Sequence, residues 1–353
     1  MKIVGRFYAR RLRSAAAAFL SSRRRGRCLV AVASAVGMLV VASGAPASAS
    51  TAARSPAVAS STVSHGLPRW SGYIHSTDGV RLWVHSVGGG AAGTRVIVLV
   101  HGGPGLSLGY LSIFDNLAGP ARQIVSYDQR GAGRSTRPAN GDYGLAAQIN
   151  DLEAVRQWTG EQQITILGHS WGGIPAAVYT ATYPGHVAAL ALLDAIPLNW
   201  TVAIAGFNSR NAIVTRLQRA GLIPNPLPPI RHNSCLALVK AITPAYFANP
   251  RLPVNRSAVW GSSCTENTAT LTFNAFARDR GELPGLAAAL GRWHGHALVM
   301  QGAKDPFGLQ WLHTSVAELR SAPTQSVVVP FAGHFPWIER TSLTLRIVRI
   351  FIR

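Results

Sequence analysis

The chain has 353 residues with 34 basic and 14 acidic side chains, a net charge of +20. Nine of the basic residues and none of the acidic ones lie in the first 49 positions, so the remainder keeps 25 basic against 14 acidic residues, a net charge of +11. Those later charges are scattered and nearly all arginine, without a basic run, which argues against specific nucleic-acid binding and indicates a solvated basic surface.

The first 49 residues have the pattern of an export signal. A basic region precedes an apolar stretch from Cys28 to Ala45, and Ala47-Ser-Ala supplies the small residues that a signal peptidase accepts. The alternative is a signal anchor, but the apolar stretch is interrupted by glycine, serine and proline and is shorter than the ~20 residues that span a bilayer. We therefore predict a cleaved signal and a secreted protein that meets the membrane only through this signal. Arg24-Arg25 leaves the twin-arginine route open beside the general one.

After the signal, residues 50–67 are rich in Ser, Ala, Thr and Pro and are predicted to form a flexible linker. Alternating polar and apolar residues on either side of Ser76-Thr-Asp-Gly predict a β-hairpin. Beyond it, short β-branched runs alternate with helical patterns, which predicts a mostly parallel, doubly wound α/β sheet. The expected strands are 69–75, 80–87, 96–100, 124–127, 164–167, 188–193, 297–300 and 326–329, and the helices include 143–158, 174–183, 311–320 and 342–350.

The alternation fails between residues 195 and 294, a segment that is rich in proline. A structureless loop of that length would be unusual in a compact domain, so we predict a helical cap inserted between two parts of the α/β core, 68–194 and 295–353. The cap holds Cys235 and Cys264, the two cysteines that remain after the signal. An even pair in an exported protein suggests a disulfide, although two buried free thiols fit the same spacing.

The most informative stretch is Ile164 to Gly173, where an apolar strand runs into Gly168-His-Ser-Trp-Gly and then a helix. This is the pattern of a nucleophile elbow, a turn so tight that its flanks need glycine while the serine hydroxyl is exposed. We predict Ser170 as a nucleophile.

A serine nucleophile needs a base and an acid that orients the base, expected in the chain order Ser, Asp, His. Asp305 follows the strand at 297–300, and His334 follows the strand at 326–329, so both lie at the sheet edge where Ser170 emerges. Asp194 also ends a strand and is the alternative acid. The developing oxyanion needs two N–H donors, which we assign to Trp171 and Gly103.

Three motifs in this order carry a family resemblance: His101-Gly-Gly-Pro-Gly, Asp128-Gln-Arg-Gly-Ala-Gly-Arg-Ser and the elbow at Ser170, followed by Asp305 and Gly333-His-Phe-Pro-Trp. With them the chain resembles α/β-hydrolases of the proline iminopeptidase-like group of serine aminopeptidases. The resemblance implies an α/β-hydrolase core, a helical cap, no metal or other cofactor, and release of an N-terminal residue, often proline, from small peptides. Asp128 and Arg130 are interpreted as structural residues of their loop.

The cap departs from that family. Its relatives hold the substrate ammonium with cap glutamates in a Trp-Glu context, whereas here Glu266 stands near the expected place without those neighbours. Glu266 either binds the amine or is a surface residue, in which case the amine site is missing.

Three functions compete on this basis. The first is a secreted aminopeptidase that forms an acyl-enzyme on Ser170, and the second is an esterase or amide hydrolase that takes an uncharged small molecule with the same triad. The third is a non-catalytic binding protein on a hydrolase scaffold, which predicts a lost triad residue, and none is lost. A metalloenzyme is disfavoured because His294 and His296 lack an accompanying ligand motif.

Overall fold

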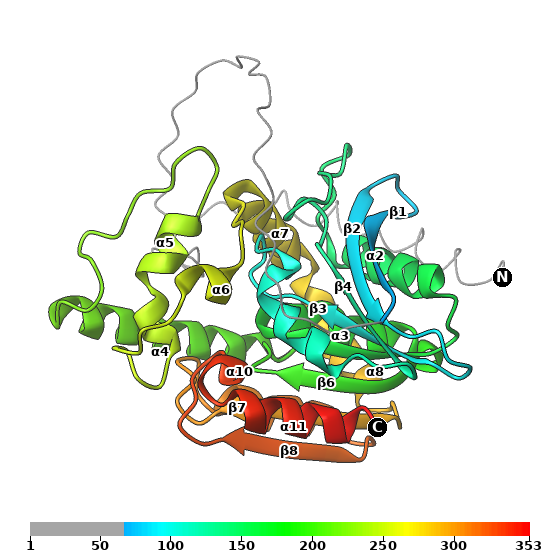
Figure 1. Ribbon diagram of the computed structural model, residues 1–353. Helices are drawn as coiled ribbons and strands as arrows, with labels where there is room; N and C mark the ends of the chain where they lie inside the picture. Colours follow the sequence, from blue (N-terminus) through cyan, green and yellow to red (C-terminus); the bar gives the residue numbers. More distant parts are fainter. Residues whose placement is uncertain (1–66) are drawn as a thin grey trace, which may run out of the picture. The chain divides into compact units, whose positions relative to one another are not determined.

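The computed structural model describes residues 67–353 (Figure 1). The predicted export signal and all but the last residue of the predicted linker lie outside the described residues. One eight-stranded sheet organises the described part, in the order β1-β2-β4-β3-β5-β6-β7-β8. The strands are β1 (Arg69–His75), β2 (Arg81–Gly88), β3 (Arg95–Val100), β4 (Arg122–Tyr127), β5 (Ile164–His169), β6 (Val187–Leu193), β7 (His296–Gly302) and β8 (Thr324–Val329).

The sheet is mostly parallel, as predicted. β1 and β2 form the antiparallel hairpin, β2 pairs antiparallel with β4, and all later pairs are parallel. All six residues of β5 are buried, as are five of the six residues of β3, so both faces of the sheet centre are covered. The apolar runs in the sequence therefore reflect burial on two sides.

Two groups of helices supply that cover. In the first group, the 3₁₀ helix η1 (Leu108–Leu117) packs against α11 (Thr341–Phe351). The second group is a row of four helices in which each contacts the next: α2 (Leu145–Thr159), α3 (Gly173–Thr182), α8 (Leu283–Leu290) and α9 (Gln310–Glu318). No helix among residues 67–353 is both long and apolar enough to cross a membrane.

The segment between β6 and β7 is mainly helical (Figure 1). Its long helix α4 (Trp200–Arg219) packs on α9, and α7 (Glu266–Asp279) contacts α2, while α8 packs on α3. The remaining helices of the segment are α5 (Leu236–Ala241), η4 (Thr243–Tyr246), α6 (Arg256–Trp260) and η5 (Arg280–Glu282). The segment therefore rests on elements that lie on both sides of it in the chain.

Candidate active site

Ser170 directly follows β5 and is the first residue of the short helix η2 (Ser170–Gly172), with φ at +54°. This left-handed backbone conformation is costly for a non-glycine residue and needs firm support from its surroundings. The flanks are crowded, since a Cβ on Gly172 would lie 2.1 Å from the carbonyl oxygen of Val100 and one on Gly168 would lie 2.7 Å from that of Gly172. The local geometry is that of the predicted elbow.

Ser170, His334 and Asp305 form a hydrogen-bonded chain. The Ser170 Oγ lies 3.0 Å from Nε2 of His334, and Nδ1 of the same ring lies 3.0 Å from Oδ2 of Asp305. His334 and Asp305 are 2% and 7% exposed, so bulk water is kept from the contact between them, whereas Ser170 is half-buried. The Nδ1 proton donates to the carboxylate, which leaves Nε2 as the acceptor for the serine hydroxyl.

Sheet topology explains why residues so distant in sequence meet. β5, β6, β7 and β8 are consecutive parallel neighbours, so the residues that follow them share one edge of the sheet. Gly302, at the end of β7, passes so close to the loop of His334 that a Cβ there would lie 2.0 Å from the carbonyl oxygen of Gly333. Lys304 N–H also donates to the Ala332 carbonyl, which holds the two loops together.

Asp194, the alternative acid in the sequence, lies at the same place. A carboxyl oxygen of Asp194, one of Asp305 and a ring nitrogen of His334 lie within 4.8 Å of one another. Such a set has the composition of a metal site, but both ring nitrogens of His334 are engaged, with Asp305 and with Ser170. Of the two acids, only Asp305 makes a hydrogen bond to His334 among the bonds of the described residues.

The loop after β3 faces Ser170 from the other side. A Cβ on Gly102 would lie 2.9 Å from that of Ser170, so the two backbones approach as closely as glycine allows. The N–H of Gly102 donates to the hydroxyl of Tyr110, and the next residue, Gly103, has φ at +123°. Trp171 is fully buried directly after the nucleophile.

A hydrogen-bonded chain that the sequence did not reveal ties this loop to His334. Gly102 N–H donates to Tyr110 over 2.5 Å, and the Tyr110 hydroxyl donates to Nδ1 of His169 over 2.7 Å. Nε2 of His169 then donates to the backbone carbonyl of His334 over 3.1 Å. Burial holds the pKa of His169 well below its usual value, so the ring stays neutral and can accept on one side while it donates on the other.

We expect Tyr110→Phe to lower kcat by about 10- to 100-fold with little change in KM, because it leaves a buried N–H and a buried ring nitrogen unpaired beside the nucleophile, at about 1–3 kcal/mol for each group. Steady-state kinetics measure the effect. Tyr73→Phe, at a residue that is 42% exposed on β1, is the matched control and should keep the full rate. Equal rates for the two variants would show that the hydrogen bonds of Tyr110 do not support catalysis.

The Asp128-Gln-Arg-Gly loop is structural, as interpreted from the sequence. The buried guanidinium of Arg130 makes two hydrogen bonds to Asp151, of 2.7 and 2.8 Å. Gln129 donates its backbone N–H to Nε2 of His101 and its side-chain amide to the carbonyl oxygen of His101. Burial raises the pKa of Asp128 to about 6, against the opposing effect of two backbone N–H donors. These contacts fix the loop on which the His101-Gly-Gly-Pro-Gly motif rests.

Helix α7 lies over the site. Its Phe273 and Phe276 pack edge-on against Trp171, with ring centroids 5.2 Å apart in both pairs. Just before the helix, Thr265 donates its N–H to the carbonyl of Gly105. The inserted segment therefore contacts the elbow and the loop after β3 directly.

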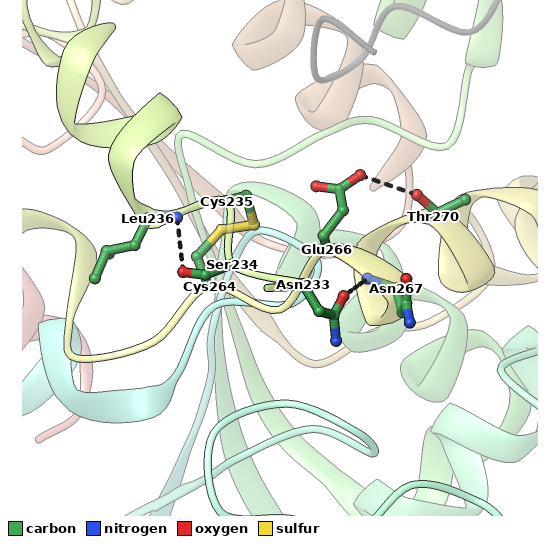
Figure 2. The surroundings of a disulfide bond; sticks show 8 residues. All are labelled: Asn233, Ser234, Cys235, Leu236, Cys264, Glu266, Asn267 and Thr270. Atoms are coloured by element: carbon green, nitrogen blue, oxygen red, sulfur yellow. Dashed lines mark hydrogen bonds between the residues drawn. A yellow bond between two sulfur atoms is a disulfide. The ribbon is translucent and has the colours of Figure 1, made fainter. Parts of the chain in front are cut away.

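Glu266 is the first residue of α7 and is 8% exposed (Figure 2). One carboxyl oxygen accepts from Thr270 over 3.1 Å, and the other is buried without a hydrogen-bond partner in the described part of the chain. Burial raises the pKa of Glu266, with the Thr270 bond acting in the opposite direction. Glu266 is therefore a buried residue in which one carboxyl oxygen has no hydrogen-bond partner among residues 67–353.

Cys235 and Cys264 form a disulfide beside Glu266 (Figure 2), which decides between the two alternatives left by their spacing. Cys235 N–H also donates to the Cys264 carbonyl, and Leu106 and Cys264 form a β-bridge. The disulfide thus fastens a segment that pairs with the loop after β3.

Removing the disulfide with the double change Cys235→Ala and Cys264→Ala should lower the free energy of unfolding by about 3–4 kcal/mol. The bond is made across a sequence separation of 29, and closing a loop of that length restricts the unfolded chain by about this amount. Urea denaturation of the oxidised wild type and the double variant gives the difference. The two proteins should become equally stable in reductant, and equal stability under oxidising conditions would contradict the prediction.

Comparisons with known proteins agree with this architecture. Residues 95–341 match the family model of the alpha/beta hydrolase fold. A proline iminopeptidase of Lactobacillus delbrueckii subsp. lactis is 39% identical over 99 residues, which are 27% of this chain and 34% of that relative, so the matched segment spans about a third of its length.

Among solved structures, proline iminopeptidase from Mycobacterium smegmatis superposes with a TM-score of 0.58 and 18% identity, over 80% of this chain and 97% of that one. An esterase from Exiguobacterium antarcticum gives 0.56 and 18%, over 79% and 98%. At these identities the structural likeness shows the fold. With a family match over most of the chain and resemblance in sequence to proline iminopeptidases, the chain belongs to the alpha/beta hydrolase fold family.

Proposed function

We propose that the chain is a serine hydrolase that releases an N-terminal residue, proline or a small apolar one, from peptides through an acyl-enzyme. The hydrogen-bonded chain from Ser170 through His334 to Asp305 is the observation that carries this proposal. Gly103 and Trp171 serve as the oxyanion donors, and Glu266 holds the substrate ammonium.

In the first half of the reaction, Ser170 Oγ attacks the scissile carbonyl while Nε2 of His334 takes its proton. The carbonyl oxygen becomes an oxyanion and is stabilised by the N–H groups of Gly103 and Trp171. His334 then returns the proton to the leaving amine. In the second half, water attacks the acyl-enzyme, with His334 again acting as base, and the released amino acid leaves Ser170 free.

The proposed amine site is supported by the unpaired oxygen of Glu266. A carboxylate that is buried with one oxygen unsatisfied is costly, and a substrate ammonium would satisfy it. Of the other two acids in the inserted segment, Asp279 accepts from the N–H of Leu145 and Glu282 is exposed. Glu266 also begins the helix whose rings pack on Trp171.

Glu266→Gln should lower kcat/KM for a free-amine prolyl arylamide by about 10- to 100-fold, mainly through KM, because it removes the charge that pairs with the ammonium. The N-acetylated arylamide, which has no ammonium, should respond by less than about twofold. Glu282→Gln is the matched control at an exposed glutamate. An equal loss for the two substrates would remove Glu266 from amine recognition.

The second function is an esterase or amide hydrolase that takes an uncharged small molecule with the same triad. The observation that favours it is the scarcity of acids, since Glu266 is the one carboxylate of the inserted segment that is both buried and partly unpaired in the described residues. This function predicts turnover of short-chain aryl esters that does not depend on an amine.

We further propose that the protein is exported and that residues 1–49 are removed. The disulfide supports export because such bonds persist in oxidising compartments. N-terminal sequencing of the protein recovered from culture medium tests it: a start near Ser50 is expected, and retention of the full chain in the cells would contradict it.

A further inference from the structure

Asp194 directly follows β6 and is anchored to β7 by two hydrogen bonds. Its backbone N–H donates to the Met300 carbonyl over 2.8 Å, and its Oδ1 accepts from the N–H of Gly302 over 2.9 Å. The residue is 1% exposed and has φ at +46°, a strained conformation that holds the side chain inward. Gly302 also accepts from the N–H of Asp305, so the two acids share one support.

The second carboxyl oxygen, Oδ2 of Asp194, is buried, and no N–H or hydroxyl group within residues 67–353 donates to it. The side chain of Asp305 lies within hydrogen-bonding reach of the Asp194 carboxyl group. The titratable groups that face Asp194 are Asp305, His334 and, further away, Glu339 on α10 (Pro336–Glu339). None of the ion pairs in the described part of the chain includes Asp194. The side chain therefore lies against a second carboxyl group, with His334 as the nearby group that can become cationic.

A carboxyl oxygen of Asp194 lies within 4.8 Å of one of Asp305. Two buried carboxyl groups this close cannot both ionise at low cost, so one of them retains a proton. Asp305 is the better anion because its carboxylate accepts from the N–H of Phe307 and from Nδ1 of His334, whereas Asp194 accepts only from Gly302. Burial and the charge of Asp305 raise the pKa of Asp194 well above its usual value. The proton is therefore expected on Asp194.

We propose that Asp194 is a protonated carboxylic acid that donates a hydrogen bond from Oδ2 to Asp305 and positions the Asp305 carboxylate toward His334. Asp194 is thus a positioning residue. Its proton stays in place during the reaction, and its hydrogen bond adds a third donor to Asp305, beside Phe307 and His334. The consequence for catalysis rests on the proposed serine hydrolase function; the protonation state does not.

Two substitutions separate the hydrogen bond from simple packing. Asparagine can donate its amide N–H to Asp305 and accept from Gly302, so Asp194→Asn should keep kcat within about twofold of the wild type. Asp194→Leu fills the space without either bond and should lower kcat by about 10- to 100-fold at unchanged KM. A similar loss of kcat in both variants would show that an ionised Asp194 is needed. Full activity of Asp194→Leu would show that the side chain only fills space. Either result overturns the proposal.

Infrared difference spectroscopy of the full chain, wild type minus Asp194→Asn, measures the proton directly and needs no substrate. At neutral pH we expect the carbonyl stretching band of a protonated carboxylic acid to be present in the wild type and absent in the variant. A difference spectrum that contains only carboxylate bands would overturn the proposal. The band would remain even if the protein cleaved no peptide, so a failure of the proposed function is distinguishable from a failure of this inference.

Discussion

Replacing Ser170 with alanine should lower kcat by about 10⁶-fold and leave the fold intact. The change removes the only atom that attacks the substrate, and triad serines in hydrolases carry an effect of about this size. The small side chain of alanine fits the elbow, where Ser170 is half-buried. Hydrolysis of prolyl arylamide by the purified variant measures the residual rate.

The control for this variant is Ser326→Ala, which changes an exposed serine on β8 and should keep the full rate. Circular dichroism and thermal unfolding should show that both variants are folded, because Ser170→Ala gives up a single hydrogen bond, to His334, and Ser326 is exposed. Wild-type activity in a clean preparation of Ser170→Ala would show that Ser170 is not the nucleophile.

Asp305→Asn should lower kcat by about 10⁴-fold with little change in KM. The asparagine amide can donate to Nδ1 of His334, which would place the ring proton on Nε2 and leave no acceptor for the Ser170 hydroxyl. The geometry is otherwise kept, since the N–H of Phe307 can still donate to the asparagine oxygen. Single-turnover kinetics of both the acylation and the deacylation step measure the loss.

The same variant decides between the two acids that the sequence placed at strand ends. Asp194→Asn is its matched control and is expected to stay near the wild-type rate. If Asp194→Asn lost activity and Asp305→Asn kept more than about a tenth of it, then Asp194 would be the acid that orients His334. That result would contradict the hydrogen-bonding pattern in which Asp305 alone of the two bonds to His334.

The sheet could be predicted from sequence because burial on two faces leaves a local signal. Each β-branched or apolar run, such as Val96–Val100, became a strand within two residues of its expected limits. The placement of Ser170, Asp305 and His334 followed from the same signal, since each comes just after a strand and neighbouring parallel strands end at one edge. The elbow was readable because steric crowding demands glycine at fixed positions.

The hydrogen bonds and the protonation around the site could not be predicted from the sequence, because they depend on contacts between distant segments. Tyr110 lies in the short helix η1, which was not predicted, and its bonds to Gly102 and His169 follow from how η1 packs on the sheet. A histidine inside the elbow motif was visible, but its role as a link to His334 was not. The proposed protonation of Asp194 depends on a neighbour 111 positions away, Asp305, and no local sequence pattern indicates that the two residues are close in space.

The inserted segment was the hardest part to predict because short helices joined by proline-rich turns carry little periodicity. The sequence indicated a helical segment but not that its helix α7 would place Phe273 and Phe276 on Trp171. It also left Glu266 between a surface position and an amine site. Burial of its carboxylate, with one oxygen unpaired, is a tertiary property that only the packed structure displays.

Whether the protein is an aminopeptidase is tested by the turnover of two matched substrates by the full chain: a prolyl arylamide with a free amine and the same arylamide with an acetylated amine. An aminopeptidase with Glu266 as its ammonium site should cleave the free-amine substrate with a kcat/KM at least about 100-fold higher than the acetylated one. Equal cleavage of the two, or ester turnover without any cleavage of the free-amine arylamide, would contradict the aminopeptidase and support the general hydrolase.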